Sequence, residues 1–146
     1  MLTEKKKEFI EFMLSAQVLR FGHFVTKSGR NTQYFVNTGN YKTGAQLSRL
    51  GSYYAQLVKD TVGGDFEAMF GPAYKGIPLA TVCAASLYRD HGIDRPYFFN
   101  RKEAKDHGEG GNTVGYQPQD GDRIIIIEDV ITAGTCLLYT SDAADD

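Results

Sequence analysis

The sequence predicts an α/β fold in which a parallel sheet with flanking helices follows an N-terminal helix and hairpin. Two observations support this prediction. From residue 65 onward, short apolar runs alternate with helical segments and loops, which is the chain order of a parallel sheet. Near the end, Ile124–Ile127 places four isoleucines in a row, as is typical of a strand buried on both faces. The length of 146 residues fits one domain.

Composition excludes several functional classes. The chain has 16 Lys+Arg and 18 Asp+Glu, a formal charge of -2, so we expect no basic face for nucleic acid. No apolar run approaches the roughly 20 residues of a membrane span, and the N-terminus lacks the apolar segment of a signal peptide. Cys83 and Cys136 are too few for a disulfide framework or a four-ligand zinc site. These observations predict a cytoplasmic protein that binds neither membranes nor nucleic acid.

The N-terminal part is predicted to hold two helices around a hairpin. Residues 3–17 have apolar side chains at helical spacing, with Thr3 as the N-cap. Residues 22–27 and 32–38 are short extended runs joined by a glycine turn, which indicates a hairpin. Residues 44–60 form the second helix, and a glycine pair ends it. The expected buried faces are Phe9, Phe12, Met13 and Ala16 in the first helix, and Leu47, Leu50, Tyr54 and Leu57 in the second.

The following part alternates strands with longer segments. Residues 66–70 form a short apolar strand, and residues 76–90 a helix rich in small residues. Residues 96–99 are a second strand. Residues 101–115 carry charges and four glycines without apolar periodicity, which predicts a mobile loop. The isoleucine strand at 124–127 comes last.

The segment IIIIEDVITAGT, Ile124 to Thr135, carries the strongest functional signal. A buried strand ends in two carboxylates, Glu128 and Asp129, and a loop of small residues and threonines follows. Ligands of open α/β sheets lie beyond the carboxyl ends of strands, and such a loop can bind an anion through its N–H groups. The carboxylates would repel a phosphate, but they accept hydrogen bonds from sugar hydroxyls. The pattern therefore predicts a site for a sugar phosphate.

Other interpretations of these residues stay open. The strand can end in a capped turn that binds no ligand. A P-loop nucleotide hydrolase also has a strand ending in an acid, but the motif G-x-x-x-x-G-K-[ST] is missing, since Gly71–Gly76 has its lysine at the wrong spacing. Taken alone, Lys75 and the interleaved charges of residues 101–109 are better explained as solvated surface groups.

Three further motifs, together with IIIIEDVITAGT, favour a ligand site over solvated surface groups. They are VLRFGHFVTKSGR (Val18–Arg30), FGPAYKGIPLA (Phe70–Ala80) and FNRKEAKDHGEGGN (Phe99–Asn112). Together they resemble the orotate phosphoribosyltransferases, and IIIIEDVITAGT is similar to the phosphoribosyl diphosphate (PRPP) signature of type I phosphoribosyltransferases. The likeness runs in the same order from about residue 8 to residue 135. It implies the type I phosphoribosyltransferase fold and transfer of ribose 5-phosphate from PRPP to orotate, which yields orotidine 5′-monophosphate and diphosphate.

The resemblance also implies roles for individual residues. Lys75, Arg101 and Lys105 are the implied catalytic cations, which stabilise the departing diphosphate. The implied PRPP-binding residues are Lys27, Tyr74, Lys75, Arg101, Lys102, Lys105, His107, Glu128, Asp129, Val130, Ile131, Thr132, Ala133, Gly134, Thr135 and Cys136. The implied orotate-binding residues are Lys27, Phe35, Val36 and Thr132. Many relatives have phenylalanine at position 36, so Val36 offers less ring area for stacking. The peptide between Ala73 and Tyr74 is expected to be strained or cis.

Cofactor and partners follow from the same resemblance. Mg²⁺ is expected to be bound mainly through PRPP, and no residue is assigned as a metal ligand. The loop 101–115 is expected to be a lid that serves the neighbouring subunit of a homodimer. Within one domain we expect a helix and hairpin hood at 1–64, a PRPP-binding core at 65–135 and a non-native tail at 136–146. Relatives continue past Thr135, so we expect a sheet that is incomplete at the C-terminus and a poor or inactive enzyme.

Two other functions remain as alternatives. One is a phosphoribosyltransferase for another base, such as adenine or hypoxanthine; the KSG turn and the NRKEAKDHGEGG segment favour orotate over it. The other is a non-catalytic PRPP-binding regulator. Such a protein needs the 128–135 site but neither Tyr74, Lys75 nor the cations of the loop, so their presence disfavours it.

Overall fold

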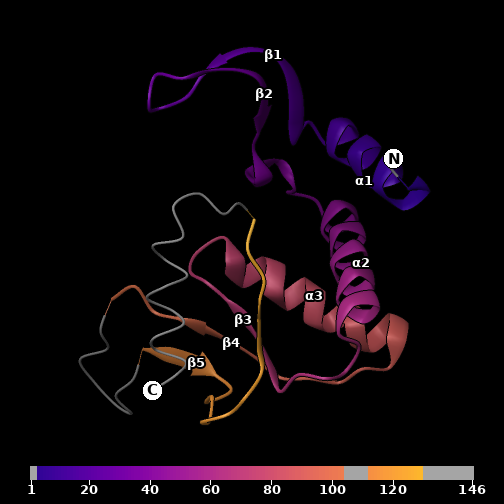
Figure 1. Cartoon of the computed structure of the whole chain (residues 1–146), viewed down its shortest axis with the longest axis vertical. Coiled ribbons are helices and arrows are strands. Elements are labelled where there is room, and N and C mark those ends of the chain that lie inside the picture. Colours follow the sequence, from indigo (N-terminus) through magenta and orange to yellow (C-terminus); the bar gives the residue numbers. More distant parts are fainter. Residues whose placement is uncertain (1–2, 104–111, 130–146) are drawn as a thin grey trace. The chain divides into compact units, whose positions relative to one another are not determined.

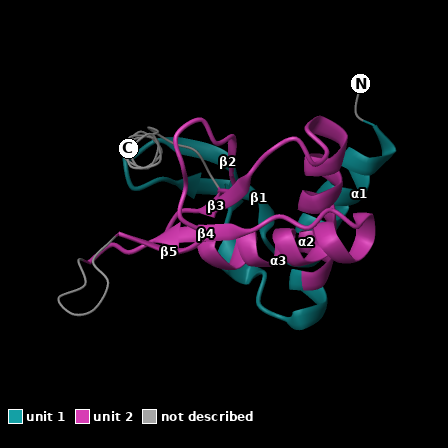
Figure 2. Ribbon diagram, turned by 90° about the horizontal axis from the view of Figure 1, so that it is seen from below, with its two compact units in different colours: residues 1–47 teal, residues 48–146 magenta. Residues whose placement is uncertain are grey.

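The computed structural model describes residues 3–103 and 112–129. The chain divides into two compact units, residues 1–47 and 48–146 (Figure 2). The division lies within a helix, and the expected boundary between hood and core after residue 64 stays a prediction. The first unit holds α1 (Glu4–Ser15), β1 (Leu19–Val25), β2 (Asn31–Val36), the 3-10 turn η1 (Thr38–Asn40) and the start of α2 (Gly44–Thr61). The second holds the rest of α2, then β3 (Ala68–Gly71), α3 (Gly76–His91), β4 (Tyr97–Asn100), β5 (Thr113–Gly115) and β6 (Ile124–Ile126).

In the first unit, the helix and the hairpin form as predicted. The Thr3 hydroxyl accepts a hydrogen bond from the Lys6 N–H, so Thr3 is the N-cap of α1. Phe12 and Ala16 of the predicted apolar face are buried. β1 pairs with β2 in antiparallel fashion, but it begins at Leu19, three residues before the predicted start. The predicted helix face was therefore right, while the predicted limits of the first strand were wrong.

In the second unit, four strands form one sheet in the order β5-β4-β3-β6. β3 pairs in parallel with both β4 and β6, whereas β5 runs antiparallel to β4. The sheet is therefore mostly parallel, which confirms the predicted α/β fold, and β5 adds one antiparallel strand at its edge. β5 lies within residues 101–115, where a mobile loop was predicted. The sequence did not indicate this strand, because three residues that include a glycine show no alternation of apolar and polar side chains.

Helix α3 packs against β3 and β4 (Figure 1). A Cβ placed on Gly71 of β3 would lie 2.8 Å from the Cβ of Ala80 in α3, so this position of β3 faces the helix. Side chains alternate along a strand, so Ala68 and Phe70 project from the opposite face. There Ala68, Phe70 and Phe98 form a buried cluster, with Tyr116, Ile124 and Ile126 packed against it.

Helix α2 contacts α3 through a different stripe from the predicted one. A Cβ on Gly51 would lie 2.6 Å from the Ser86 hydroxyl, so the two helices approach closely at this glycine. The buried residues of α2 are Leu50, Gly51, Ala55 and Val58. Leu57 was expected in the stripe but is 63% exposed, because the true face is rotated toward Gly51 and Ala55. No helix in the described part of the chain is long and apolar enough to cross a membrane.

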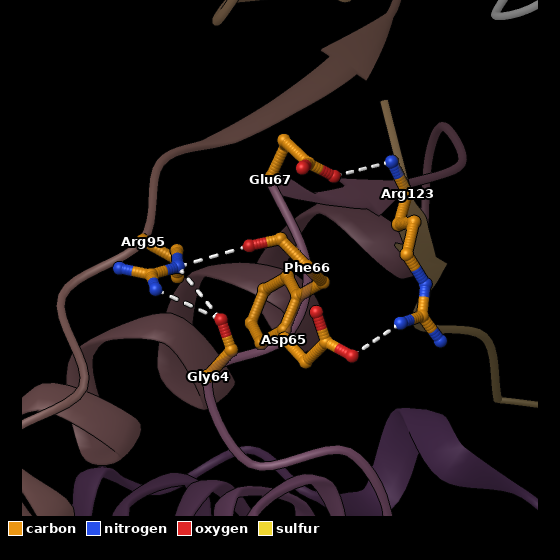
Figure 3. A network of polar contacts seen from close by, with 6 residues as sticks. All are labelled: Gly64, Asp65, Phe66, Glu67, Arg95 and Arg123. Carbon is orange, nitrogen blue, oxygen red and sulfur yellow. Dashed lines mark hydrogen bonds and ion pairs between the residues drawn. The ribbon is translucent and has the colours of Figure 1, made fainter. Parts of the chain in front are cut away.

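Two arginines join the amino ends of the three parallel strands (Figure 3). Arg95, before β4, donates to the carbonyl oxygens of Gly64 and Phe66, with distances of 2.8 Å from Nη2 and 2.9 Å from Nε. From the opposite side, Arg123, before β6, forms an ion pair with Asp65, and its N–H donates to the Glu67 carboxylate. These contacts connect the first residues of β3, β4 and β6 at the amino-terminal edge of the sheet.

The isoleucine strand differs from its prediction. Ile127 is buried at 4% exposure, but the side chains of β6, from Ile124 to Ile126, are only half-buried. Within the described residues β6 pairs with β3 alone and is the last strand of the sheet. The expectation of burial on both faces was wrong for these three residues, because side chains on the last strand of the described sheet have packing neighbours on one side only.

Candidate functional site

The carboxyl ends of three strands meet at one edge of the sheet. Gly71 at the end of β3 is in register with Phe99 of β4, and Phe70 is in register with Ile126 of β6. All three strands run parallel, so the segments that follow them leave the sheet on the same side. These segments are residues 72–75, 101–103 and 127–129. Such an edge, with β3 between two parallel neighbours, is where ligands bind in open α/β sheets.

The loop from β3 to α3 is packed so tightly that it needs glycine at both ends. A Cβ on Gly71 would lie 2.4 Å from the carbonyl oxygen of Gly76, and a Cβ on Gly76 would lie 2.6 Å from Cδ of Pro72. No side chain fits at either distance. The peptide between Ala73 and Tyr74 is cis, as the family resemblance led us to expect.

Hydrogen bonding of this loop leaves two N–H groups for a ligand. The Gly76 N–H donates to the Pro72 carbonyl at 2.9 Å, and the Ile77 N–H donates to the Tyr74 carbonyl at 3.2 Å. The Ala73 N–H donates to Oδ1 of Asn100 at 2.7 Å. Among the described residues, the N–H groups of Tyr74 and Lys75 meet no hydrogen-bond acceptor. Two adjacent free N–H groups beside a lysine side chain are suited to binding an anion.

Cations reach this edge from the end of β4. Arg101 follows β4 directly, and its N–H donates to the Asn112 carbonyl at 2.6 Å. The Lys102 ammonium lies 5.2 Å from the centre of the Tyr74 ring, within the range of a cation–π contact. Lys75, Arg101 and Lys102 thus follow two neighbouring strands of the sheet.

The end of β6 brings two carboxylates to the same edge. The Ile127 N–H donates to the Phe70 carbonyl at 2.9 Å and continues the ladder with β3. The Tyr54 hydroxyl of α2 donates to the Glu128 carbonyl at 3.2 Å. The Asp129 N–H donates to Oε1 of Glu128 at 2.9 Å. Burial raises the pKa of Tyr54 to about 12, with the nearby charge of Asp129 as a further cause, so its hydroxyl stays protonated.

Burial raises the pKa of Glu128 above its ordinary value, and the Asp129 carboxyl acts in the same direction, while the hydrogen bond from the Asp129 N–H lowers it. Lys102 also lowers it, because a positive charge favours the ionised carboxylate. A carboxyl whose pKa is raised by folding binds its proton more tightly when folded. Ionisation of Glu128 therefore lowers the free energy of unfolding. This loss of stability grows as pH rises from the pKa of the unfolded chain, about 4.3, through the higher pKa of the folded chain.

Glu128→Gln should therefore raise the unfolding midpoint at pH 7. The amide keeps an oxygen for the Asp129 N–H and carries no charge. The advantage over the unsubstituted chain should shrink as pH falls toward 4, because Glu128 then becomes largely protonated in both states. Thermal melts of both chains from pH 4 to pH 7 test this. A constant difference across that range would contradict it.

The structure brings together only part of the predicted site. Tyr74, Lys75, Arg101, Lys102, Glu128 and Asp129 follow the three strands at one edge. Lys105 and His107 lie outside the described residues, as do Val130, Ile131, Thr132, Ala133, Gly134, Thr135 and Cys136. The predicted tail at 136–146 and residues 104–111 of the predicted lid are likewise outside them.

The predicted orotate residues Lys27, Phe35 and Val36 belong to the other unit. Lys27 lies in the hairpin turn, where the Gly29 N–H donates to the Thr26 carbonyl. Phe35 is 40% exposed, and its ring centre is 5.5 Å from that of Phe24. The Arg20 guanidinium lies 5.8 Å from the centre of the Phe35 ring. Their place in an orotate pocket stays a prediction.

Two residues of the site were missed from the sequence. Asn100 was read only as part of a strand-end motif, although a polar side chain directly after an apolar strand and before Arg101 is a usable signal. Tyr54 was assigned to the apolar stripe of α2, and no local pattern indicates that its hydroxyl contacts residue 128.

A metal ion would find few protein ligands here. The described residues contain no cluster of three or more His, Cys, Asp or Glu that could hold one. Glu128 and Asp129 offer two adjacent carboxylates at the same edge of the sheet as the loop 72–75. This donor set fits Mg²⁺, a hard cation that is commonly bound through one or two carboxylates and the oxygens of a phosphate ligand.

Comparisons with known proteins agree with the arrangement. No family model matches the chain. The chain is 56% identical over 135 residues to an orotate phosphoribosyltransferase of Clostridium botulinum, covering 92% of this chain and 60% of that protein. A crystal structure of orotate phosphoribosyltransferase from Francisella tularensis is 45% identical with a TM-score of 0.80, covering 92% of this chain and 62% of the other. Adenine phosphoribosyltransferase of Saccharomyces cerevisiae, at 11% identity, shares the fold with a TM-score of 0.59 over 93% of this chain and 83% of that one.

The fold and the strand-end site define the chain as an α/β protein of the phosphoribosyltransferase class. Its sequence narrows the likeness to the orotate phosphoribosyltransferases, with 56% identity to the Clostridium botulinum protein and 45% to the Francisella tularensis structure, each over 92% of this chain. It spans about 60% of the length of the curated relatives that it matches.

Proposed function

We propose that the whole protein is an orotate phosphoribosyltransferase, which transfers ribose 5-phosphate from PRPP to N1 of orotate and so serves pyrimidine (UMP) biosynthesis. The products are orotidine 5′-monophosphate and diphosphate. The observation that carries the proposal is the meeting of Lys75, Arg101 and the carboxylates of Glu128 and Asp129 beyond three parallel strands. The high identity to orotate phosphoribosyltransferases supports orotate over adenine as the base.

The loop after β3 would bind the diphosphate of PRPP. The N–H groups of Tyr74 and Lys75 and the Lys75 ammonium donate to its oxygens, and Arg101 and Lys102 add charge from the end of β4. Lys105 and His107 complete this set in the proposal. Negative charge grows on the diphosphate as the bond to the anomeric carbon breaks. Cations that are already in place stabilise that charge without reorganisation, so Lys75, Arg101 and Lys105 act as catalytic residues.

The carboxylates after β6 would bind the ribose. Glu128 and Asp129 accept hydrogen bonds from its hydroxyls, while residues 130–136 bind the 5-phosphate. The Tyr54 hydroxyl holds the main chain at Glu128, so the acids keep their place beside β3. The ribose is thereby bound both through its hydroxyls and through its 5-phosphate, and its anomeric carbon faces the loop after β3.

Orotate would be bound by Lys27, Phe35, Val36 and Thr132. An aromatic ring packs on the base, and the ammonium of Lys27 pairs with its negative charge. Mg²⁺ would arrive with PRPP, held by its oxygens and by Glu128 or Asp129, and would neutralise part of the diphosphate charge. The proposal also includes a homodimer in which the loop 101–115 serves the neighbouring subunit, and a cytoplasmic location, which suits the buried free thiol of Cys83.

A thermal melt of the chain with PRPP and Mg²⁺ tests the binding part of the proposal. A ligand that binds only the folded chain adds about 2.7 kcal/mol of stability at a hundredfold excess over its Kd. Lys75→Ala should weaken PRPP binding by about ten- to a hundredfold, because a hydrogen bond to a charged group contributes roughly 1.5–3 kcal/mol. Lys59→Ala, an exposed lysine of α2, is the matched control and should bind PRPP normally.

Two outcomes would count against the proposal. A cooperative melt that PRPP does not shift would contradict the PRPP site, and equal effects of Lys75→Ala and Lys59→Ala would contradict the role of Lys75. Assays of the whole protein with orotate, adenine and hypoxanthine then decide the base. Turnover with adenine but not orotate would favour the alternative enzyme, and PRPP binding without turnover on any base would favour a regulator.

A further inference from the structure

Asn100 connects the two strand ends that carry the cations of the site. Its Oδ1 accepts the Ala73 N–H at 2.7 Å, across 27 residues of sequence. It ends β4, directly before Arg101, and Ala73 lies two residues before Lys75. A single side chain therefore joins the loop that offers free N–H groups to the segment that offers Arg101 and Lys102.

The same hydrogen bond decides which N–H groups are left for a ligand. In residues 73–77 the N–H groups of Ala73, Gly76 and Ile77 have acceptors, and those of Tyr74 and Lys75 have none among the described residues. Of the three acceptors, the Pro72 and Tyr74 carbonyls belong to the loop itself, and only Oδ1 of Asn100 comes from another segment. Without it, the Ala73 N–H would lack a partner, and the loop would be free to turn its N–H groups away from the edge.

The chemistry of the acceptor matters as well as its place. An amide oxygen accepts the Ala73 N–H without adding negative charge. A carboxylate could accept the same hydrogen bond, but it would add a negative charge beside the site of an anion. Asparagine thus combines the required acceptor with the neutrality that an anion site needs.

We propose that Asn100 is a positioning residue that holds the loop 72–75 in its diphosphate-binding conformation, and that its neutrality is required for anion affinity. It acts through the Tyr74 and Lys75 N–H groups and does not itself contact the substrate. This inference rests on the proposed function, since it concerns the diphosphate part of the same site.

The test uses two variants and one control in the full chain. Asn100→Ala removes the acceptor, and Asn100→Asp keeps an acceptor but adds charge. Thr61→Ala is the control, because Thr61 is exposed at the end of α2 and its hydroxyl donates to the Leu57 carbonyl of the same helix. For each chain, amide hydrogen exchange of Ala73 is measured without ligand, and the Kd of diphosphate with Mg²⁺ is measured by calorimetry.

The expected results differ between the two variants. Asn100→Ala should speed Ala73 exchange and weaken diphosphate binding, each by about tenfold, which corresponds to one hydrogen bond of about 1.4 kcal/mol. Asn100→Asp should keep Ala73 protected and still bind diphosphate about tenfold more weakly. Thr61→Ala should change neither quantity. If Asn100 only stabilised the fold, Asn100→Asp would not combine a protected Ala73 N–H with weaker diphosphate binding.

Each contrary outcome has a definite meaning. Unchanged Ala73 exchange in Asn100→Ala, or faster exchange with unchanged diphosphate affinity, overturns the positioning role. If Asn100→Ala does not fold, Asn100→Asp decides, and full diphosphate affinity in that variant overturns the proposal. If the unsubstituted chain binds no diphosphate, the proposed function fails at this site and the binding role of Asn100 fails with it. If the unsubstituted chain binds diphosphate normally, a contrary result in the variants counts against the role of Asn100 alone.

Discussion

Gly71→Ala should lower the free energy of unfolding by about 3 kcal/mol and abolish diphosphate binding. The added methyl would lie 2.4 Å from the Gly76 carbonyl oxygen and 2.8 Å from the Ala80 Cβ. The first contact is with backbone, so relief requires moving the start of α3 or the end of β3. Either movement displaces the Tyr74 and Lys75 N–H groups. Urea unfolding and diphosphate calorimetry measure the two effects.

Gly44→Ala is the matched control for this substitution. Gly44 is the first residue of α2, and a Cβ there would meet nothing within 4 Å. Alanine is the better helix former, so the control should be neutral or slightly stabilising. Unfolding of Gly71→Ala at the same urea concentration as the unsubstituted chain would show that the loop after β3 relaxes at no cost.

Phe70→Ala should cost about 3–5 kcal/mol, the range typical of removing a buried phenylalanine ring. Phe70 is 1% exposed, and its ring centre lies 4.8 Å from that of Phe98 on the neighbouring strand. Removing the ring leaves a cavity between β3 and β4, which Ala68 is too small to fill. Phe70 also precedes Gly71, so loosening of this pair is expected to weaken ligand binding at the strand ends.

The control for Phe70 is an aromatic residue at the surface of the same unit. Tyr88 of α3 is 61% exposed, so Tyr88→Ala should change the free energy of unfolding by only about 0.5 kcal/mol or less. Comparable losses from the two substitutions would contradict a core centred on Phe70 and Phe98. A graded series with Phe70→Leu would show whether the loss follows the volume removed.

Much of the fold could be predicted because its elements have local signatures. The N-cap Thr3, the hairpin turn and the helix at 76–90 follow from residue type and spacing within a few positions. Errors arose where packing overrides local pattern. Leu57 has helical spacing with Leu50 but is exposed, because α2 contacts α3 at Gly51. The two helices approach so closely there that only glycine fits, and the pattern of apolar spacing does not include glycine as part of a buried face.

The candidate site divides in the same way. Lys75, Arg101 and the acids Glu128 and Asp129 were found in the sequence, since each follows a recognisable strand. Asn100 and Tyr54 were not, because their contacts span 27 and 74 residues and depend on strand order. Nothing near position 100 reveals that its amide oxygen reaches residue 73.

The amino-acid order alone was enough for the alternation of strands and helices, for the chemistry of the strand ends and for the family to which they are similar. These properties depend on neighbours a few residues apart, which the sequence displays directly. The tertiary structure alone decided that β6 lies beside β3, that β5 runs antiparallel and that the N–H groups of Tyr74 and Lys75 find no acceptor in the part of the chain that the structure describes. Strand pairing brings distant residues into register, and register determines which donors find acceptors within the chain and which are left for a ligand.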